Sequence, residues 1–475
     1  MKLNKIFKSV TQMVSSGLLV KLLTILQAII LMKVLDPYDF GIVAIGLTFL
    51  LILSRFQSIG ISEALIADKD LKDKSSNFST LFCIRLPLSI FLFTLAFFFS
   101  PYWANLYNDE AITDVVRILS LSLLIKSFGI VSKTSLEIDL EFGKLAKISI
   151  IESAVKSLSI IFFAFQGYGY FSIIFGHIIS SIIETALFLY YSPWWPKFEF
   201  NYIVAKKYIA YGKWIFLASL LYSILSSYDA FLIGKYLSLV DLGLYAVSLR
   251  WGYLSLLHVT PHFQKVLFTA LSSKEYNTDI KSSYLKSNFV IAIITFPVTV
   301  GIIFIAEDLL FAIAGEKWLN AVMPLRIMAI CGLVRSFIVA DPIFASENRP
   351  QYQSYTLMLS LLFIFIFLYF SIIWQGLIGA TLCITFTFLL HYLYSHYFLN
   401  KILRINLIDI FYEIVKPFLA SMIMLLTLNL TKNMIYNFIQ NDIISLIAII
   451  CVGMATYFFL IYYTLKEEIL SKISS

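Results

Sequence analysis

The chain has 475 residues, of which 60% are apolar and only 14% are charged, and its mean hydropathy is +0.85. Soluble globular domains do not have this composition, so water cannot be the main solvent of the chain. The formal net charge of +7 comes mostly from lysines in short loops between apolar runs, which is where membrane topology places them, so nucleic acid is not expected as a partner.

Apolar runs of about twenty residues recur along the whole chain, each long enough to cross a hydrocarbon core roughly 30 Å thick. These runs are too long and too unbroken for the strands of a barrel. The sequence therefore predicts an all-α integral membrane protein with about fourteen transmembrane helices. The expected helices are 11–32, 41–66, 79–100, 111–132, 145–165, 168–192, 210–233, 241–263, 287–311, 321–344, 352–373, 376–399, 408–430 and 441–464.

The basic residues of the loops indicate the orientation of these helices. The loops expected on the cytoplasmic side hold 22 Lys and Arg, those on the outer side hold 4, and the remaining 10 lie inside helices. Because basic loops stay in the cytoplasm, this bias predicts an even number of spans with both termini inside. The outer loops are too short for a catalytic domain, which disfavours a membrane glycan polymerase or ligase.

The cysteines give no sign of a metal centre. Each of them lies in an apolar segment and has no companion at metal-ligand spacing: Cys83, Cys331, Cys383 and Cys451. Neither a metal nor an organic cofactor is expected, and the protein is not expected to be an enzyme.

An internal repeat relates two connections of the chain. Residues 33–47 align with residues 235–249 without a gap at an offset of 202, and six positions are identical. The shared residues include Asp39 with Asp241 and Gly41 with Gly243. Both segments fall between equivalent helices, the first and second and the seventh and eighth. A second, weaker match pairs residues 166–167 with 375–376, both Gln-Gly.

The repeat predicts two parallel six-helix halves, because the first and seventh helices both leave the cytoplasm. Such halves can enclose a central site and rock about it to alternate access. The expected divisions are an N-lobe at 1–208, a C-lobe at 209–404 and two additional C-terminal helices at 405–475. We interpret Asp39 and Asp241 as residues that cap the first turns of their helices.

Cations inside the membrane are costly, roughly 2.5–3.5 kcal/mol each at the bilayer centre, so those retained at depth need a wet or paired environment. Arg85, Arg117 and Lys265 lie near predicted helix ends and are expected to snorkel to the interface. Glu152 and Lys156 stand four residues apart on one helix and are expected to pair.

The cations that remain near mid-depth are the candidate binding residues for an anionic headgroup such as a lipid pyrophosphate: Lys21, Arg55, Lys126, Arg250 and Arg335. Buried structural pairing is the alternative role for each of them. Two intramembrane acids, Glu184 and Asp229, are candidates for coupling to a proton or sodium gradient, although neither stands in a recognisable ion site.

Several segments resemble the polysaccharide transporters of the multidrug/oligosaccharidyl-lipid/polysaccharide superfamily, in particular the Wzx-type O-antigen and colanic-acid flippases. The matching segments follow the order expected for helices one to ten, and they are residues 32–41, 58–66, 167–170, 229–234, 243–246 and 315–318. The last two helices carry no such motif.

This resemblance implies two six-helix lobes in a V around a cationic cavity. It further implies that the chain moves a polyprenyl-pyrophosphate-linked oligosaccharide, such as an O-antigen, capsule or exopolysaccharide unit, to the outer leaflet of a bacterial inner membrane. The related lipid II flippases carry cations in helices one, two and eight, where Lys21, Arg55 and Arg250 stand here. Lys21 occupies a place where an arginine is expected, and a lysine does not bind phosphate in a bidentate manner.

The expected partners are the undecaprenyl-pyrophosphate-linked oligosaccharide, membrane lipids and other polysaccharide assembly proteins. The alternative within transport is an ion-coupled multidrug exporter of the same superfamily. Such an exporter needs acidic residues deep in a lobe, and the cations outnumber the two candidate acids.

Overall fold

The computed structural model describes residues 2–474 apart from 59, 68–73, 254–255, 257–279, 348 and 350. Within these residues the regular elements are helices, and no strand is present. Ten helices of this part are long and apolar enough to cross a membrane, among them the 53-residue α15 (Gln351–Leu403), which contains a kink. The all-helical membrane class is confirmed, whereas the count of fourteen stays a prediction.

Contacts between helices divide the chain into two compact units, Met1–Gly243 and Leu244–Ser475. In the first unit α8 (Tyr202–Tyr236) packs on α2 (Pro37–Ser58), which is why α8 is grouped with that unit. The expected divisions at 1–208, 209–404 and 405–475 stay predictions.

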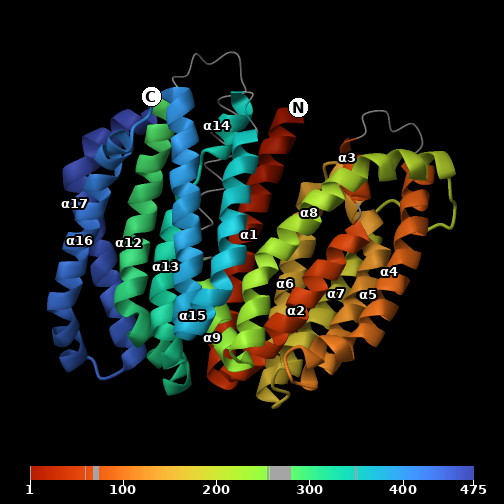
Figure 1. Cartoon of the computed structure of the whole chain (residues 1–475), viewed down its shortest axis with the longest axis horizontal. Helices are drawn as coiled ribbons and strands as arrows, with labels where there is room; N and C mark the ends of the chain where they lie inside the picture. Colours follow the sequence, from red (N-terminus) through yellow and green to blue (C-terminus); the bar gives the residue numbers. More distant parts are fainter. Residues whose placement is uncertain are drawn as a thin grey trace. The chain divides into compact units, whose positions relative to one another are not determined.

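The first unit also contains six further helices whose bounds are α1 (Lys2–Val34), α3 (Ile61–Ala67), α4 (Lys74–Asn105), α5 (Ala111–Ile138), α6 (Phe142–Phe165) and α7 (Phe171–Tyr191). Figure 1 shows α4 to α7 side by side. Small residues let these helices approach closely, since a Cβ on Gly176 of α7 would lie 2.2 Å from Ile160 of α6. A Cβ on Gly129 of α5 would lie 3.1 Å from Thr185 of α7.

The second predicted helix, 41–66, is wrong as a single helix. The structure has α2 and α3 instead, separated by a break at Gly60, whose φ of +67° places it in the left-handed region that glycine favours. The break frees carbonyl groups at the end of α2, and in a membrane these groups must find protein donors.

The two copies of the repeat contact each other reciprocally. A Cβ built on Gly41 of α2 would lie 1.7 Å from the carbonyl oxygen of Leu239, at the start of α9 (Leu239–Ser248). A Cβ built on Gly243 would lie 1.8 Å from the carbonyl oxygen of Pro37. Because Pro37 and Leu239 are also equivalent in the repeat, the contact has two-fold symmetry, as in an isologous interface. This symmetry supports the internal repeat.

Asp39 caps the start of α2, as expected, whereas at α9 the capping residue is Ser238 and Asp241 accepts from its hydroxyl. The Asp39 carboxylate accepts a hydrogen bond from the Asp36 backbone N–H (2.9 Å), which precedes the first turn of α2. At α9 the Ser238 hydroxyl donates to Asp241 (2.7 Å) and accepts from the Asp241 backbone N–H (3.0 Å). Asp39 also accepts from the backbone N–H of Tyr170 (3.1 Å) and so joins α2 to the turn before α7.

The second unit packs α16 (Leu407–Phe438) and α17 (Asp442–Ser474) onto α12 (Ile280–Ala314). Apolar side chains of all three helices form one buried cluster. Ion pairs join α12 to α16 near both ends, Lys281 with Asp409 at 3.0 Å and Lys432 with Asp308 at 2.5 Å. The Tyr457 hydroxyl of α17 donates to the backbone of α12 (2.8 Å).

The rest of the second unit is built around α13 (Val322–Ser336), which packs between η1 (Leu249–Tyr253) and α15. Short helices η2 (Glu316–Ala321) and α14 (Asp341–Ser346) flank α13. The kink of α15 lies at Gln375 and Gly376, where a turn between two helices was expected. Gly376 and its weaker repeat partner Gly167 both have positive φ, +58° and +82°.

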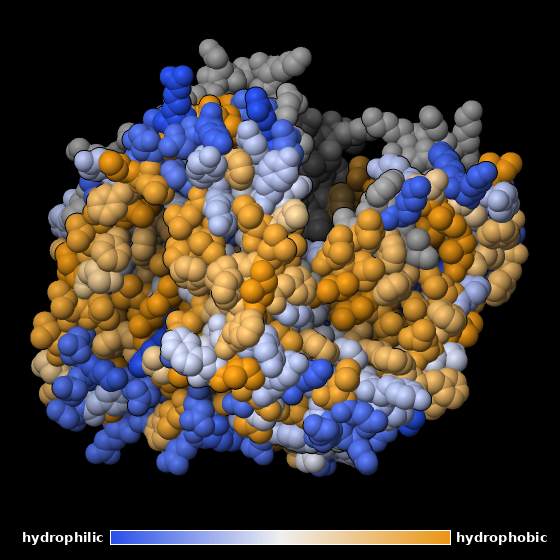
Figure 2. Space-filling model, in the orientation of Figure 1, coloured by the Kyte–Doolittle hydropathy of each residue, from blue (hydrophilic) through white to orange (hydrophobic). Residues whose placement is uncertain are grey.

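The surface of each unit carries the pattern of a membrane protein. On the visible face of each unit, hydrophobic residues form a middle band and hydrophilic residues gather at the two ends (Figure 2). Large apolar side chains in the band are exposed, such as Phe98 of α4 at 70%. Such exposure is expected where the solvent is lipid.

Candidate functional site

The expected headgroup cations are Lys21, Arg55 and Lys126 in the first unit and Arg250 and Arg335 in the second. Each cation is described within its own unit below. A single cavity lined by all five stays a prediction.

Lys21 lies on α1 and is half-buried. Two turns further along, the buried Gln27 accepts a hydrogen bond from Ser157 of α6 (3.0 Å), which fixes α1 against α6. Among the side chains that the structure describes, Lys21 contacts no acid within ion-pair distance.

Arg55 lies in the last turn of α2 and is also half-buried. Its Nε donates a short hydrogen bond (2.7 Å) to the hydroxyl of Ser223 on α8. None of the described carboxylates forms an ion pair with Arg55. The structural-pair alternative is thus not seen in this part of the chain, and the two Nη groups keep their donors for another ligand.

Lys126 and Glu184 bind each other. The Lys126 ammonium of α5 lies 3.2 Å from the Glu184 carboxylate of α7, and both side chains are partly exposed. The expected pair of Glu152 and Lys156 is present at 3.9 Å on α6. A headgroup candidate and a coupling candidate therefore share one ion pair.

Asp229, the second coupling candidate, lies on α8 and is half-buried. Its Oδ1 accepts from the backbone N–H of Ala230 (2.8 Å). Among the described residues, no group of three or more His, Cys, Asp or Glu side chains could hold a metal ion.

Arg250 lies on η1, a π-helical turn that continues α9, and its side chain is exposed. Such turns have one extra residue per turn and occur frequently at functional sites. Glycines hold η1 close to α13, since a Cβ on Gly252 would lie 2.9 Å from the backbone of Ala329. A Cβ on Gly332 of α13 would lie 3.0 Å from the Tyr253 carbonyl.

Arg335 lies on the same helix, α13, in contact with aromatic rings. Its guanidinium group is 5.8 Å from the centre of the Phe388 ring, and that ring is 5.6 Å from Tyr253 of η1. The Phe388 ring therefore lies between Arg335 and the turn that carries Arg250. His391, on α15 with Phe388, forms a hydrogen bond with Ser360 (3.0 Å).

Arg85 is the polar residue that sequence reasoning misplaced. It does not snorkel, because only 4% of it is exposed. Its Nη2 donates to the Ser58 carbonyl (3.3 Å) and to the Ser62 hydroxyl (3.1 Å), one on each side of the helix break. In the sequence, Gly60 inside the predicted second helix was the one sign of the helix break that Arg85 stabilises. Arg117 lies over Phe97 at 4.5 Å, and Lys265 is outside the described residues.

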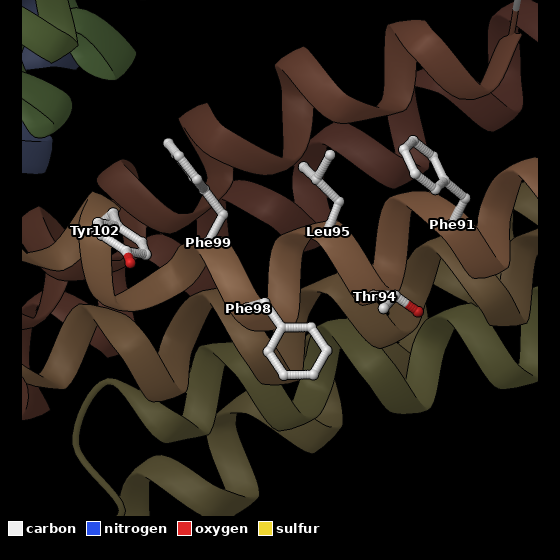
Figure 3. A pocket seen from close by; sticks show the side chains of 6 residues that line it. All are labelled: Phe91, Thr94, Leu95, Phe98, Phe99 and Tyr102. Carbon is white, nitrogen blue, oxygen red and sulfur yellow. The ribbon is translucent and has the colours of Figure 1, made fainter.

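One surface hollow is not suited to an anionic headgroup. It lies on α4, has a volume of about 360 Å³, and is lined by aromatic and aliphatic side chains with Thr94. Figure 3 shows Phe91, Leu95 and Phe99 along one side of the helix and Phe98 on another. No charged residue lines this hollow, which fits acyl chains of the membrane.

Curated proteins of bacterial polysaccharide pathways are similar to this chain along most of its length. An uncharacterised membrane protein in the cps region of Klebsiella pneumoniae is 26% identical over 434 residues, 89% of this chain and 88% of that protein. The teichuronic acid biosynthesis protein TuaB of Bacillus subtilis is 25% identical and covers 76% of each chain. The lipopolysaccharide biosynthesis protein WzxC of Escherichia coli is 21% identical and covers 84% and 78%.

Two solved structures share the fold. A lipid II flippase MurJ, in an inward closed conformation, has a TM-score of 0.73 at 17% identity and covers 96% of this chain and 99% of its own. An inward-facing multidrug transporter of the MATE family has a TM-score of 0.62 at 15% identity, with coverages of 81% and 94%. At these identities the likeness concerns the fold alone.

Residues 30–323, more than half of the chain, match the polysaccharide biosynthesis protein family. The matched region contains both copies of the repeat and three of the five candidate cations, Arg55, Lys126 and Arg250, whereas Lys21 and Arg335 lie outside it. The expected resemblance is confirmed, and the chain belongs to the polysaccharide biosynthesis protein family.

Proposed function

We propose that this protein translocates a polyprenyl-pyrophosphate-linked oligosaccharide from the cytoplasmic to the outer leaflet by alternating access. The observation that carries the proposal is the family match over residues 30–323 in a chain built of membrane helices. A hydrophilic glycan made in the cytoplasm cannot cross hydrocarbon unaided, because its polar groups would lose their hydrogen bonds to water. In this proposal the membrane helices of the protein carry the glycan across the hydrocarbon.

The pyrophosphate is held, in this proposal, by cations that have no described acid beside them. Arg55 offers its two Nη groups, and Arg250 is exposed on its π-helical turn. Lys21 adds a point charge from α1. Arginine matches the geometry of phosphate oxygens in a bidentate manner, which gives orientation as well as attraction.

The ion pair of Lys126 with Glu184 supports a coupled role for both residues. A proton or sodium ion on Glu184 would weaken its hold on Lys126 and release that ammonium group toward the headgroup. Arg335 and Asp229 complete the set of proposed substrate and coupling residues. Nothing in this cycle breaks or forms a covalent bond, so the proposed activity is transport without catalysis.

The proposed setting is the bacterial inner membrane, with both termini in the cytoplasm and the glycan supplied by other polysaccharide assembly proteins. The basic loops support this orientation. The relatives TuaB and WzxC are named for teichuronic acid and lipopolysaccharide biosynthesis, which supports a cell-envelope glycan as the cargo.

The test uses purified protein in vesicles that contain a labelled lipid-linked oligosaccharide, and it measures exposure of the label in the outer leaflet. We expect translocation by the wild type and a loss of about tenfold or more in Arg55→Ala and Arg250→Ala, since each removes a charge-assisted phosphate contact. Arg117→Ala is the matched control, because Arg117 already lies over Phe97.

Three outcomes would count against parts of the proposal. Absence of translocation by wild-type protein would reject the flippase function, and export of organic cations in the same vesicles would favour the multidrug alternative. Normal translocation by both arginine variants would reject the proposed headgroup site while leaving the function in place.

A further inference from the structure

The last turn of α2 is fixed on one face by buried hydrogen bonds. Gln57 is buried, and its Nε2 donates to the Ser89 hydroxyl of α4 (2.7 Å) and to the Leu123 carbonyl of α5 (2.8 Å). Arg85 of α4 holds the next residue, Ser58, by its carbonyl. These bonds prevent the end of α2 from rotating, because any rotation would leave buried polar groups without partners.

Arg55 consequently points to the other side of α2. It precedes Gln57 by two residues, which corresponds to about 200° around an α-helix, so the two side chains leave opposite faces. The opposite face packs on α8, where Arg55 meets Ser223. The position of Arg55 is therefore set by α4 and α5 from behind and by α8 in front.

Ser223 is arranged as a hydrogen-bond acceptor for this arginine. Its side chain is fully buried, and its hydroxyl donates to the carbonyl of Ser219 one turn earlier on α8 (2.9 Å). The hydroxyl proton is thereby committed, and the oxygen presents its lone pairs to the Nε of Arg55 at 2.7 Å. The contact fixes the plane of the guanidinium group through Nε and leaves both Nη groups uncommitted among the described residues.

We propose that Ser223 is a positioning residue, which orients the Arg55 guanidinium so that its two Nη groups bind the phosphate oxygens of the lipid-linked substrate. This inference rests on the proposed function. A guanidinium group that rotates freely about its stem loses entropy when it binds phosphate in a bidentate manner, whereas one already held through Nε loses less. Ser223 thus acts on substrate affinity through Arg55 and does not itself touch the substrate.

The test compares Ser223→Ala, Ser223→Thr and Ser226→Ala in the vesicle assay. We expect Ser223→Ala to raise the apparent KM for the lipid-linked oligosaccharide by about tenfold with a smaller effect on the maximal rate, since a hydrogen bond to a charged group is lost. Ser223→Thr keeps a hydroxyl and should restore most of the affinity. Ser226 is the matched control, because its exposed hydroxyl donates to the Tyr222 carbonyl of its own helix and no other described group accepts from it.

The decisive measurement is a double-mutant cycle with Arg55→Lys. A lysine has no Nε in the arginine geometry, so Ser223→Ala should cause no further loss in the Arg55→Lys background. Equal losses in both backgrounds would overturn the proposal, because Ser223 would then act independently of Arg55. A Ser223→Ala variant that behaves like Ser226→Ala would overturn it as well.

Binding of geranylgeranyl pyrophosphate to detergent-purified protein separates this proposal from the function. Weaker binding in Ser223→Ala, dependent on Arg55, would support the positioning role even if the wild type translocated no oligosaccharide. Translocation by the wild type together with unchanged pyrophosphate affinity in Ser223→Ala would reject the positioning role and leave the flippase function intact.

Discussion

The reciprocal contact of the two repeat copies makes a quantitative prediction about Gly41→Ala and Gly243→Ala. Ordinary van der Waals contact begins at 3.4 Å, but the new Cβ atoms would lie 1.7 Å and 1.8 Å from backbone carbonyl oxygens. Each substitution must therefore separate the starts of α2 and α9 by about 1.6–1.7 Å. A carbonyl oxygen cannot rotate out of the way as a flexible side chain can.

We expect each substitution to lower the free energy of unfolding by roughly 1–3 kcal/mol, the usual cost of overpacking. This loss should appear although alanine is the better helix former by about 1 kcal/mol. The double variant should lose less than the sum of the single losses, because the first Cβ already separates the two backbones.

The assay is thermal unfolding of the purified protein in detergent, with Gly301→Ala as the control. Gly301 lies inside α12, and a Cβ there would meet nothing within 4 Å. Its substitution should be neutral or stabilising. The reasoning is refuted if Gly41→Ala is as stable as the wild type. It is also refuted if the stability losses of Gly41→Ala and Gly243→Ala differ from each other by more than they differ from that of Gly301→Ala.

The other predictions concern single contacts of the two units. Arg85→Leu should cost roughly 1–3 kcal/mol of unfolding free energy, because the half-buried Ser58 carbonyl loses its donor, and this is measured by thermal unfolding. Lys126→Ala should reduce transport and stability, and adding Glu184→Gln should recover part of the stability, since the unpaired carboxylate is removed. Gly376→Ala should lower the unfolding temperature, because the kink requires a φ of +58° with a ψ of −134° that only glycine adopts readily.

Each of these predictions has a clear contrary outcome. An Arg85→Leu protein as stable as an Arg117→Leu protein would show that the helix break does not need the buried donor. Equal stability of the Lys126→Ala single variant and its double variant would show that the pair is not coupled. A fully stable Gly376→Ala protein would show that the kink relaxes without cost.

The amino-acid sequence predicts the membrane helices because lipid and water select side chains so differently. The third helix was expected at 79–100 and extends over Lys74–Asn105 in the structure. Hydropathy detects only the part of a helix that lies in hydrocarbon, and α4 continues with polar residues at both ends. The break at Gly60 escaped prediction because its stabilising donor, Arg85, comes from another helix.

The candidate site was only partly predictable for the same reason. Depth in the membrane identified Arg55 and Lys126 as unusual cations, since their cost in lipid is a local property. Their partners are not local, because Ser223 is 168 residues from Arg55 and Glu184 lies two helices beyond Lys126. A single sequence does not indicate which of its polar residues meet across such distances.

The aspartate and the glycine of the repeat have different roles in the folded protein. In both copies the aspartate is the third residue of its helix and the glycine is the fifth, so the two leave opposite sides of the first turn. Asp39 and Asp241 can therefore take part in the hydrogen bonds at the starts of their own helices while Gly41 and Gly243 face the other copy. The carbonyl that each glycine admits belongs to the first residue of the opposite helix. Each copy supplies a glycine that leaves space and a carbonyl group that fills the space left by the other copy, so the motif is self-complementary. A substitution in one copy should therefore disturb the packing of the other.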